Sequence, residues 1–255
     1  MDIDLNADLG EGYGPWRMGE DEALLDIVSS ANVACGFHAG DPLIMDRTVR
    51  LALARGVDVG AHVGFPDRQG FGRRPMQIDI AELAAMVTYQ LGALAGMARA
   101  AGHRMSHMSF HGALGNMAAA DPALAGPLLR AVADFDPSLI VSSSSSRAIE
   151  TAAMHCGLRV ATTFLADRAY DDEGLLVPRK LPESVIADES RVLDRVRRLL
   201  DDGTVVTYSG KTLPMRVHAI LLHGDTAGAV MLARTIRREV ESRGHRIVPM
   251  SRQTA

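Results

Sequence analysis

Short apolar runs alternate with amphipathic stretches along the whole chain, and this alternation predicts a β/α protein. The apolar runs predict strands at 3–8, 31–35, 57–62, 104–111, 139–141, 158–164 and 217–223, with a further short strand at 205–207. The stretches with helical spacing predict helices at 20–29, 42–55, 80–101, 122–134, 147–156, 189–201 and 226–243. Strands that alternate with helices in this way favour a parallel sheet.

Two of the predicted helices have a clear chemical start signal. Asp41-Pro42 and Asp121-Pro122 each place a carboxylate where it can accept hydrogen bonds from free backbone N–H groups, followed by a proline suited to the first helical turn. Gly56 then provides a stop for the first of these helices.

Each predicted strand is followed by a polar cluster, and the carboxyl ends of parallel strands meet at one face of a sheet. An open doubly wound sheet concentrates its ligands at one switch point, whereas these clusters follow nearly all strands. The pattern therefore favours a closed barrel. We predict that residues 1–255 form a single domain, a seven-stranded TIM-like β/α barrel.

Composition narrows the class of protein. The chain has 255 residues, 47% hydrophobic and 23% charged, which is typical of a globular protein of one barrel domain. A formal net charge of −4 without a basic stripe argues against nucleic-acid binding. Apolar runs stay well below the ~20 residues of a membrane span, no signal peptide is visible, and two cysteines cannot form a disulfide framework. We expect a cytoplasmic enzyme with no membrane association.

Four histidines lie at strand ends, which is an unusual concentration. They suit either a metal-free acid/base array or a metal site, and a metal would be held by Asp8, His62 and His111. Three of the neighbouring acids also have structural interpretations, because Asp8 could cap a glycine loop and Asp41 and Asp225 could cap helices. The candidate catalytic residues are Asp8, Glu11, His38, Asp41, His62, His111, Asp167, His223 and Asp225.

Four further residues are candidates for binding substrate, namely Asn6, Arg168, Tyr170 and Asn116. Asn6 lies two positions before Asp8, so both side chains point to the same side of a strand, the interior of a barrel. Arg168 suits bidentate capture of a carboxylate or phosphate, although an ion pair with Asp171 or Asp172 would also explain it.

Two other features carry less chemistry. Cys35 could be a nucleophile, but a cysteine at the end of an apolar strand is more often a small buried residue. The serine run at 142–146 predicts a loop that either offers hydroxyl groups to a ligand or is flexible filler.

The same clusters resemble the LamB/YcsF family, which includes the A component of 5-oxoprolinase. The resemblance extends over nearly the whole chain in the same order. It rests on the strings DLNADLGE (4–11), SANVACGFHAGDP (30–42), GAHVGFPD (60–67), QGFGRRP (69–75), HGALGN (111–116), ADRAY (166–170) and HGDT (223–226).

The resemblance implies a barrel related to glycoside hydrolase and deacetylase barrels, and an activity in ATP-dependent ring opening of 5-oxoproline to glutamate. It also implies partner subunits B and C, which would supply ATP and substrate activation. A divalent metal and a homo-oligomer remain open. Two alternatives are a stand-alone metal-dependent amide hydrolase or deacetylase, and a non-catalytic subunit that binds a small acid.

The chain departs from the family pattern around His111. Ser109, Phe110 and Gly115 stand where the family has Lys, Pro and Tyr, and Val63 and Phe65 stand where it has Pro and Tyr. We therefore expect the ligand contacts of this member to differ near the fourth strand.

Overall fold

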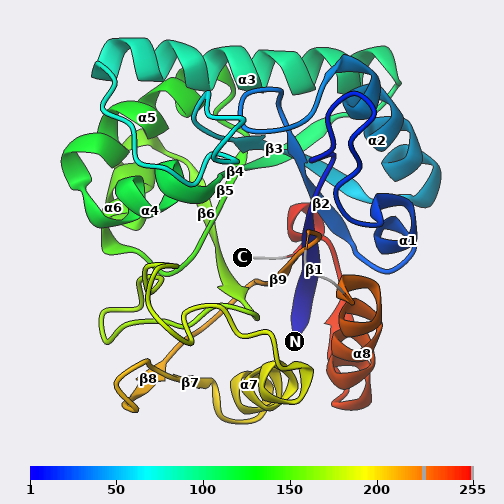
Figure 1. The fold of residues 1–255 in the computed structure, drawn as a ribbon, viewed down its shortest axis with the longest axis vertical. Coiled ribbons are helices and arrows are strands. Elements are labelled where there is room, and N and C mark those ends of the chain that lie inside the picture. Colours follow the sequence, from blue (N-terminus) through cyan, green and yellow to red (C-terminus); the bar gives the residue numbers. More distant parts are fainter. Residues whose placement is uncertain (226–227, 254–255) are drawn as a thin grey trace.

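Seven parallel strands close into a barrel in the computed structural model, which describes residues 1–225 and 228–253 (Figure 1). Closure comes from the first strand, which pairs with the second on one side and with the last on the other. The barrel strands are β1 (Asp2–Leu9), β2 (Ser30–Ala34), β3 (Asp58–Val63), β4 (Met105–Phe110), β5 (Ile140–Ser143), β6 (Arg159–Leu165) and β9 (Ala219–His223). The predicted seven-stranded β/α barrel is therefore confirmed.

Helices surround the barrel, with α3 on one side and α7 and α8 on the opposite side (Figure 1). They are α1 (Asp21–Leu25), α2 (Pro42–Arg55), α3 (Ile80–Ala100), α4 (Gly112–Ala120), α5 (Pro122–Phe135), α6 (Arg147–Cys156), α7 (Glu189–Asp202) and α8 (Ala229–Ser242). Among the short elements, β7 (Thr204–Val206) and β8 (Thr212–Pro214) form an antiparallel pair, β10 (Arg246–Ile247) extends β1, and the 3₁₀ helix η1 (Met250–Arg252) follows.

The two predicted helix starts behave as expected. The Asp41 carboxylate accepts hydrogen bonds from the backbone N–H groups of Leu43 (2.9 Å) and Ile44 (3.0 Å). Asp121 accepts one from Ala123 at 2.9 Å. Gly56 ends α2 in the left-handed conformation, with φ of 67°, a geometry that glycine adopts without steric cost.

Three helical segments differ from the sequence prediction. The helix expected over 20–29 ends at Leu25, because Ser29 turns its hydroxyl toward Asp4 and β2 begins at Ser30. Helix α4 is not predicted from the sequence, since His111 precedes it without any side-chain cap. The predicted start at Thr226 lies outside the described residues, and α8 begins at Ala229.

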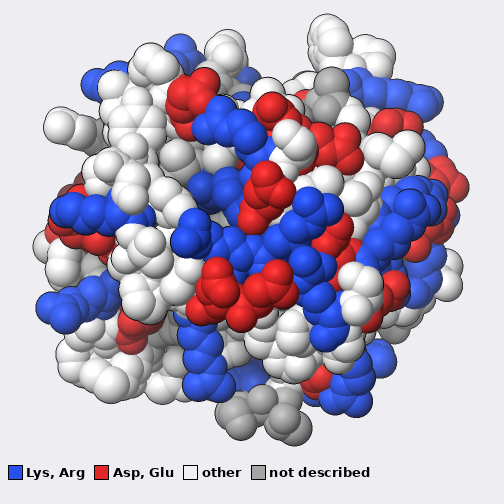
Figure 2. All heavy atoms as spheres, turned by 90° about the horizontal axis from the view of Figure 1, so that it is seen from below, with Lys and Arg blue, Asp and Glu red and all other residues white. Residues whose placement is uncertain are grey.

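Helix α3 is long and apolar enough to span a membrane by length and composition alone. In the structure, however, its apolar face packs against β3, β4 and α5. The buried side chains on that face are Leu83, Val87, Leu91, Leu94 and Ala98. The helix is thus an element of the outer layer of the barrel. On the molecular face seen in Figure 2, basic and acidic side chains are interspersed.

The barrel interior is polar along β1, where Asp4, Asn6 and Asp8 are all buried. At the lower end Asp4 accepts hydrogen bonds from the hydroxyls of Ser29 (2.6 Å) and Ser30 (2.7 Å), both on one oxygen. Its other oxygen has no partner among the described residues. The opposite side of this lower end is closed by an apolar group consisting of Ile140, Ala161, Ala219 and Met250.

Burial of Asp4 makes the stability of the fold depend on pH. Desolvation raises the pKa of Asp4 from 3.8 to about 7, so the folded chain retains a proton that the unfolded chain loses above pH 4. Stability should therefore fall as pH rises toward 7. We expect Asp4→Asn to remove most of this fall, which is on the order of 3 kcal/mol between pH 5 and pH 8.

Urea unfolding at the two pH values measures the effect. The exposed Asp134 on α5 provides the control, because Asp134→Asn removes the same charge without altering the barrel interior. Equal pH dependence of wild type and Asp4→Asn would show that Asp4 is ionised throughout.

Candidate active site

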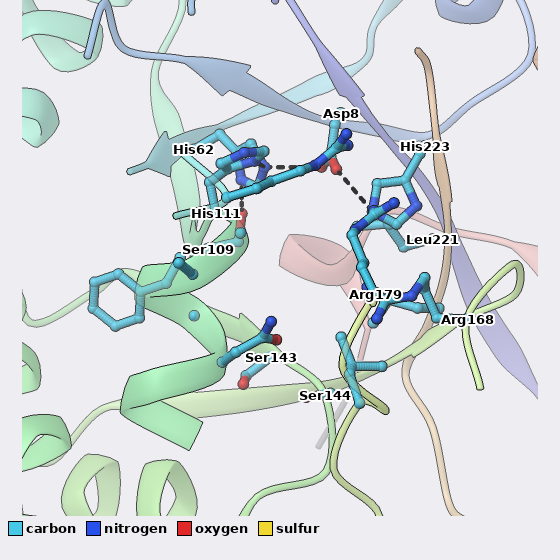
Figure 3. A pocket seen from close by; sticks show the side chains of 18 of the residues that line it. Asp8, His62, Ser109, His111, Ser143, Ser144, Arg168, Arg179, Leu221 and His223 are labelled. Atoms are coloured by element: carbon cyan, nitrogen blue, oxygen red, sulfur yellow. Dashed lines mark hydrogen bonds and ion pairs between the residues drawn. The ribbon is translucent and has the colours of Figure 1, made fainter. Parts of the chain in front are cut away.

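Three histidines and two carboxylates gather at the carboxyl ends of the first four strands (Figure 3). Asp8 lies on β1 and His62 on β3, whereas Glu11, His38 and His111 lie in the segments that follow β1, β2 and β4. All five are at least 95% buried. The barrel strands thus bring together residues that are more than 100 positions apart in the sequence.

A chain of hydrogen bonds fixes the protonation of two histidines. His111 Nε2 lies 2.7 Å from the carbonyl oxygen of Phe71, which can only accept, so this nitrogen carries a hydrogen. In the neutral ring Nδ1 of His111 then accepts from His62 Nε2 at 2.8 Å. His62 Nδ1 in turn accepts the hydroxyl hydrogen of Ser109 at 2.7 Å. Ser109, one of the residues that departs from the family pattern, therefore orients His62.

The loop after β3 covers this cluster, as its predicted length suggested. Phe71 has a φ of 53°, an uncommon conformation for a non-glycine residue, and it directs its carbonyl toward His111. The next residue must be glycine, because a Cβ on Gly72 would lie 2.7 Å from the Cβ of His38 and 2.8 Å from His111 Cδ2. At the start of the loop, Gln90 of α3 binds both backbone groups of Gly64.

Burial keeps these three imidazoles neutral. Desolvation lowers the pKa of His62 to about 3, and nearby positive groups contribute to this lowering. The pKa values of His38 and His111 also lie well below the ordinary value, again chiefly through burial. The rings of His38 and His111 stack with centroids 3.8 Å apart, so a positive charge on one disfavours a charge on the other. At neutral pH each ring can accept a proton.

The two carboxylates of the cluster are poised near protonation. Burial raises the pKa of Asp8, and burial followed by repulsion from Asp8 raises the pKa of Glu11 well above its usual value. Asn32 steadies Asp8 by donating from Nδ2 at 2.9 Å, and Asp8 lies 3.5 Å from His62 Nε2. Glu11 lies 3.3 Å from His38 Nε2. A carboxylate with a raised pKa suits general base catalysis.

A fourth histidine faces this cluster with the opposite charge. Burial alone would lower the pKa of His223, but the carboxylate of Asp167, 2.8 Å from Nδ1, raises it overall. Nε2 of His223 lies 4.0 Å from Asp8 and 3.3 Å from Nη2 of Arg179. The site therefore has a wall of neutral bases and a wall with positive charge.

Between the two walls lies a cavity of about 490 Å³. This volume is in the range of small-molecule sites. Its remaining lining includes side chains from the fourth, fifth and sixth strands and from the connector that follows β6, and Figure 3 shows several of them. Among these residues are Asn116, Ser142, Ser143, Ser144, Thr163, Arg168, Arg179 and Lys180.

Two predicted catalytic acids lie apart from the base cluster. Asp41 uses its carboxylate on the backbone N–H groups that start α2 and on that of Gly14, at 2.7 Å, and it does not line the cavity. Asp225 pairs with Arg73, with 2.9 Å between Oδ2 and Nη2.

The predicted substrate-binding residues also separate. Asn116 lines the cavity, whereas Asn6 lies beneath it and donates to Asn32 at 3.4 Å. The buried Tyr170 hydroxyl accepts from the backbone N–H of Leu165 at 2.7 Å. Arg168 makes neither of the ion pairs considered from sequence, because its guanidinium donates to the carbonyls of Val177 and Ser184.

Cys35 fits its structural interpretation. It is buried, and burial raises the pKa of its thiol to about 12, so the nucleophilic thiolate is disfavoured.

Sequence reasoning missed Asn32, Arg73 and Arg179. Asn32 had a usable signal, since it alternates with Ser30 on β2 as Asp8 does with Asn6 on β1. Arg73 lies in the covering loop and Arg179 in the irregular connector, where no periodicity indicates which way a side chain points.

Four side chains offer donor atoms that lie within 4.8 Å of one another, namely Glu11, His38, His62 and His111. His62 and His111 fit a metal well, because the Ser109 hydroxyl and the Phe71 carbonyl can each bind the ring nitrogen turned away from it. His38 fits less well. Its Nδ1 is buried without a partner among the described residues, so coordination through Nε2 would leave an unpaired buried N–H.

Comparison with known proteins identifies close relatives over almost the full length. The chain matches the LamB/YcsF family over residues 3–255. It is 72% identical to the 5-oxoprolinase A-type subunit 2 of Ralstonia nicotianae, over 99% of this chain and 97% of that protein. It is 68% identical to the 5-oxoprolinase A-type subunit 1 of Pseudomonas syringae pv. tomato, over 98% of each. The crystal structure of a lactam utilization protein from Thermus thermophilus is 40% identical, with a TM-score of 0.89, covering 97% of this chain and 99% of that one.

The two walls should be separable by histidine titration. Because Asp167 holds the pKa of His223 above its usual value, Asp167→Asn should lower that pKa by at least about one unit. The other three site histidines should remain neutral down to pH 5 in both proteins. Histidine-selective NMR titration measures this. An unchanged pKa of His223 in Asp167→Asn, or protonation of His62 above pH 6, would contradict the assignment of charge.

Proposed function

The chain belongs to the LamB/YcsF family, and we propose that it is the ring-opening subunit of a 5-oxoprolinase, hydrolysing the lactam 5-oxoproline to glutamate. The observation that carries the proposal is the hydrogen-bond chain Ser109–His62–His111–Phe71 beside Asp8, because it places bare proton acceptors at one wall of a cavity. The names of relatives at 72% and 68% identity support the substrate.

Ring opening needs a base for water and an acid for the leaving nitrogen. Asp8 lies between the neutral His62 and the charged His223, at 3.5 Å and 4.0 Å. In the proposed reaction Asp8, supported by His62 and His111, removes a proton from the attacking water. The water oxygen bonds to the lactam carbonyl carbon, and the carbon–nitrogen bond breaks. The ring nitrogen takes a proton from His223, whose positive charge Asp167 maintains.

A lactam amide is a weak electrophile, so an activation step is required. We assign this step to partner subunits B and C, which would phosphorylate the carbonyl oxygen with ATP and make the carbon easier for water to attack. The subunit names of the relatives support a multi-subunit enzyme. Ring opening of the activated lactam leaves an acyl phosphate, and a second water molecule hydrolyses it. The free cysteines Cys35 and Cys156 accord with a cytoplasmic location.

The base wall is tested by removing its imidazoles. We expect His62→Ala and His111→Ala each to lower kcat at least ~100-fold, the usual contribution of general acid–base catalysis. The measurement is ATP-dependent glutamate release from 5-oxoproline by the chain with its two partner subunits. His155→Ala, which changes an exposed histidine on α6, is the matched control and should retain full activity.

Full activity in both site variants would show that the base wall is not the catalytic centre. Tight binding of 5-oxoproline with no turnover by the complete enzyme would instead identify a non-catalytic, acid-binding subunit.

A second candidate function is metal-assisted amide hydrolysis, favoured by the close approach of imidazole and carboxylate donors at the cavity wall. We propose Asp8, His62 and His111 as the ligands, for the reasons of hydrogen bonding given above. A divalent ion there supplies polarisation of a carbonyl or a bound water of lowered pKa. The residues around it would keep the roles of orienting His62 (Ser109) and His111 (Phe71).

Cobalt binding tests this candidate without relying on activity. If these three residues form a site, chelator-treated protein should bind about one equivalent of Co²⁺ with a visible absorption band. His111→Ala should abolish the band, whereas His38→Ala should retain it. Absence of the band in wild-type protein that is fully active with ATP and its partners would remove the metal candidate.

A further inference from the structure

The cavity contains four cationic side chains, and their availability for a ligand differs. Arg73, Arg168, Arg179 and Lys180 all line it. A substrate that carries a carboxylate must place this group near one of them, because the opposite wall holds the buried carboxylate of Asp8. The contacts of each cation decide which one is free to bind it.

Two of the arginines are already committed to the protein. Arg168 is 2% exposed, and it donates from Nε to the carbonyl of Ser184 at 3.1 Å and from Nη2 to that of Val177 at 2.7 Å. These bonds hold the connector that follows β6 against the barrel. Arg73 pairs with Asp225 at 2.9 Å and its guanidinium lies over the ring of Phe71.

Arg179 differs from both. Among the described residues no carboxylate lies within ion-pair distance of it, and its one hydrogen-bond contact is from Nη2 to His223 Nε2 at 3.3 Å. It occupies the part of the connector fixed on either side by the bonds of Arg168, so its position is set although its side chain reaches solvent. The rest of its guanidinium fork is available for two parallel hydrogen bonds to a carboxylate.

The contact with His223 adds a second reason for an anion at this place. His223 Nδ1 faces Asp167, and when the ring is protonated its Nε2 becomes a donor directed at another donor, Nη2 of Arg179. Two donors cannot bond each other, whereas an anionic oxygen between them accepts from both. Ser143 and Ser144, on the neighbouring wall, offer further hydroxyl groups (Figure 3).

We propose that Arg179 recognises the carboxylate of the substrate and so orients the lactam amide toward Asp8, His62 and His111. The inference rests on the proposed function and deepens it. It transfers the role that sequence reasoning gave to Arg168, whose guanidinium instead fixes the connector that carries Arg179.

The test compares Arg179→Gln with wild type in the complete enzyme and in the isolated chain. Removing a charge-assisted bidentate contact should raise KM for 5-oxoproline by between ~10-fold and ~100-fold, with kcat changed less than about threefold. Calorimetric titration of the isolated chain with 5-oxoproline should show a matching rise in Kd. For 2-pyrrolidinone, the same ring without the carboxylate, Kd should be equal in the two proteins.

Two variants make the comparison sharper. Arg179→Lys retains the charge but not the fork, so it should recover part of the lost affinity. Arg104→Gln removes an exposed arginine next to β4 at the opposite end of the barrel, and it should leave KM, kcat and Kd unchanged.

Each result decides between the possibilities. KM and Kd within twofold of wild type in Arg179→Gln would overturn the inference, as would a loss confined to kcat or an equal loss for 2-pyrrolidinone. Failure of the proposed function is recognised separately, by the absence of 5-oxoproline-dependent turnover in wild-type enzyme. The binding comparison on the isolated chain would still decide the role of Arg179 in that case.

Discussion

The burial of carboxylates along β1 is the constraint on which the rest of this structure depends. Asp4 and Asp8 both point into the barrel, where an ionised group without partners is very costly. The neighbouring strands supply what the two acids need: serine hydroxyls at the lower end, and the amide of Asn32 with the imidazoles of His62 and His223 at the upper end. The interior is therefore a polar layer that each strand helps to satisfy, and chemistry becomes possible where that layer meets the cavity.

The division of charge across the cavity follows from distance to a carboxylate rather than from residue type. All four site histidines are buried, yet only His223 has a carboxylate against its ring at 2.8 Å, and it alone of the four has a raised pKa. His62 and His111 are instead hydrogen-bonded to each other and to neutral groups, which keeps both as acceptors. One kind of side chain thus provides both the acid and the base, because the strands place it in two environments.

Much of the fold and part of the site could be predicted from the sequence. The strand pattern, the Asp-Pro helix starts and the histidines at strand ends are local signals, and each was recovered in the structure. Helix α4 was missed because its N-terminus lacks a capping side chain. Arg168 and Arg179 could not be ranked from sequence, because their roles depend on which backbone carbonyls a long connector brings near them. Residue type predicted a cation at this wall, and tertiary contacts decided which one is free.

The seam of the barrel lies inside the active site. Asp8 and His223 are direct neighbours in the register between β1 and β9, the pair of strands that closes the barrel. Acid and base therefore come from opposite ends of the polypeptide, and they meet only when the last strand has joined the first. During synthesis a ribosome-bound chain that lacks β9 has its base wall but no acid, so catalytic competence appears together with ring closure. Long-range pairing of this kind is a slow step in folding. The enzyme is consequently inert until it is whole.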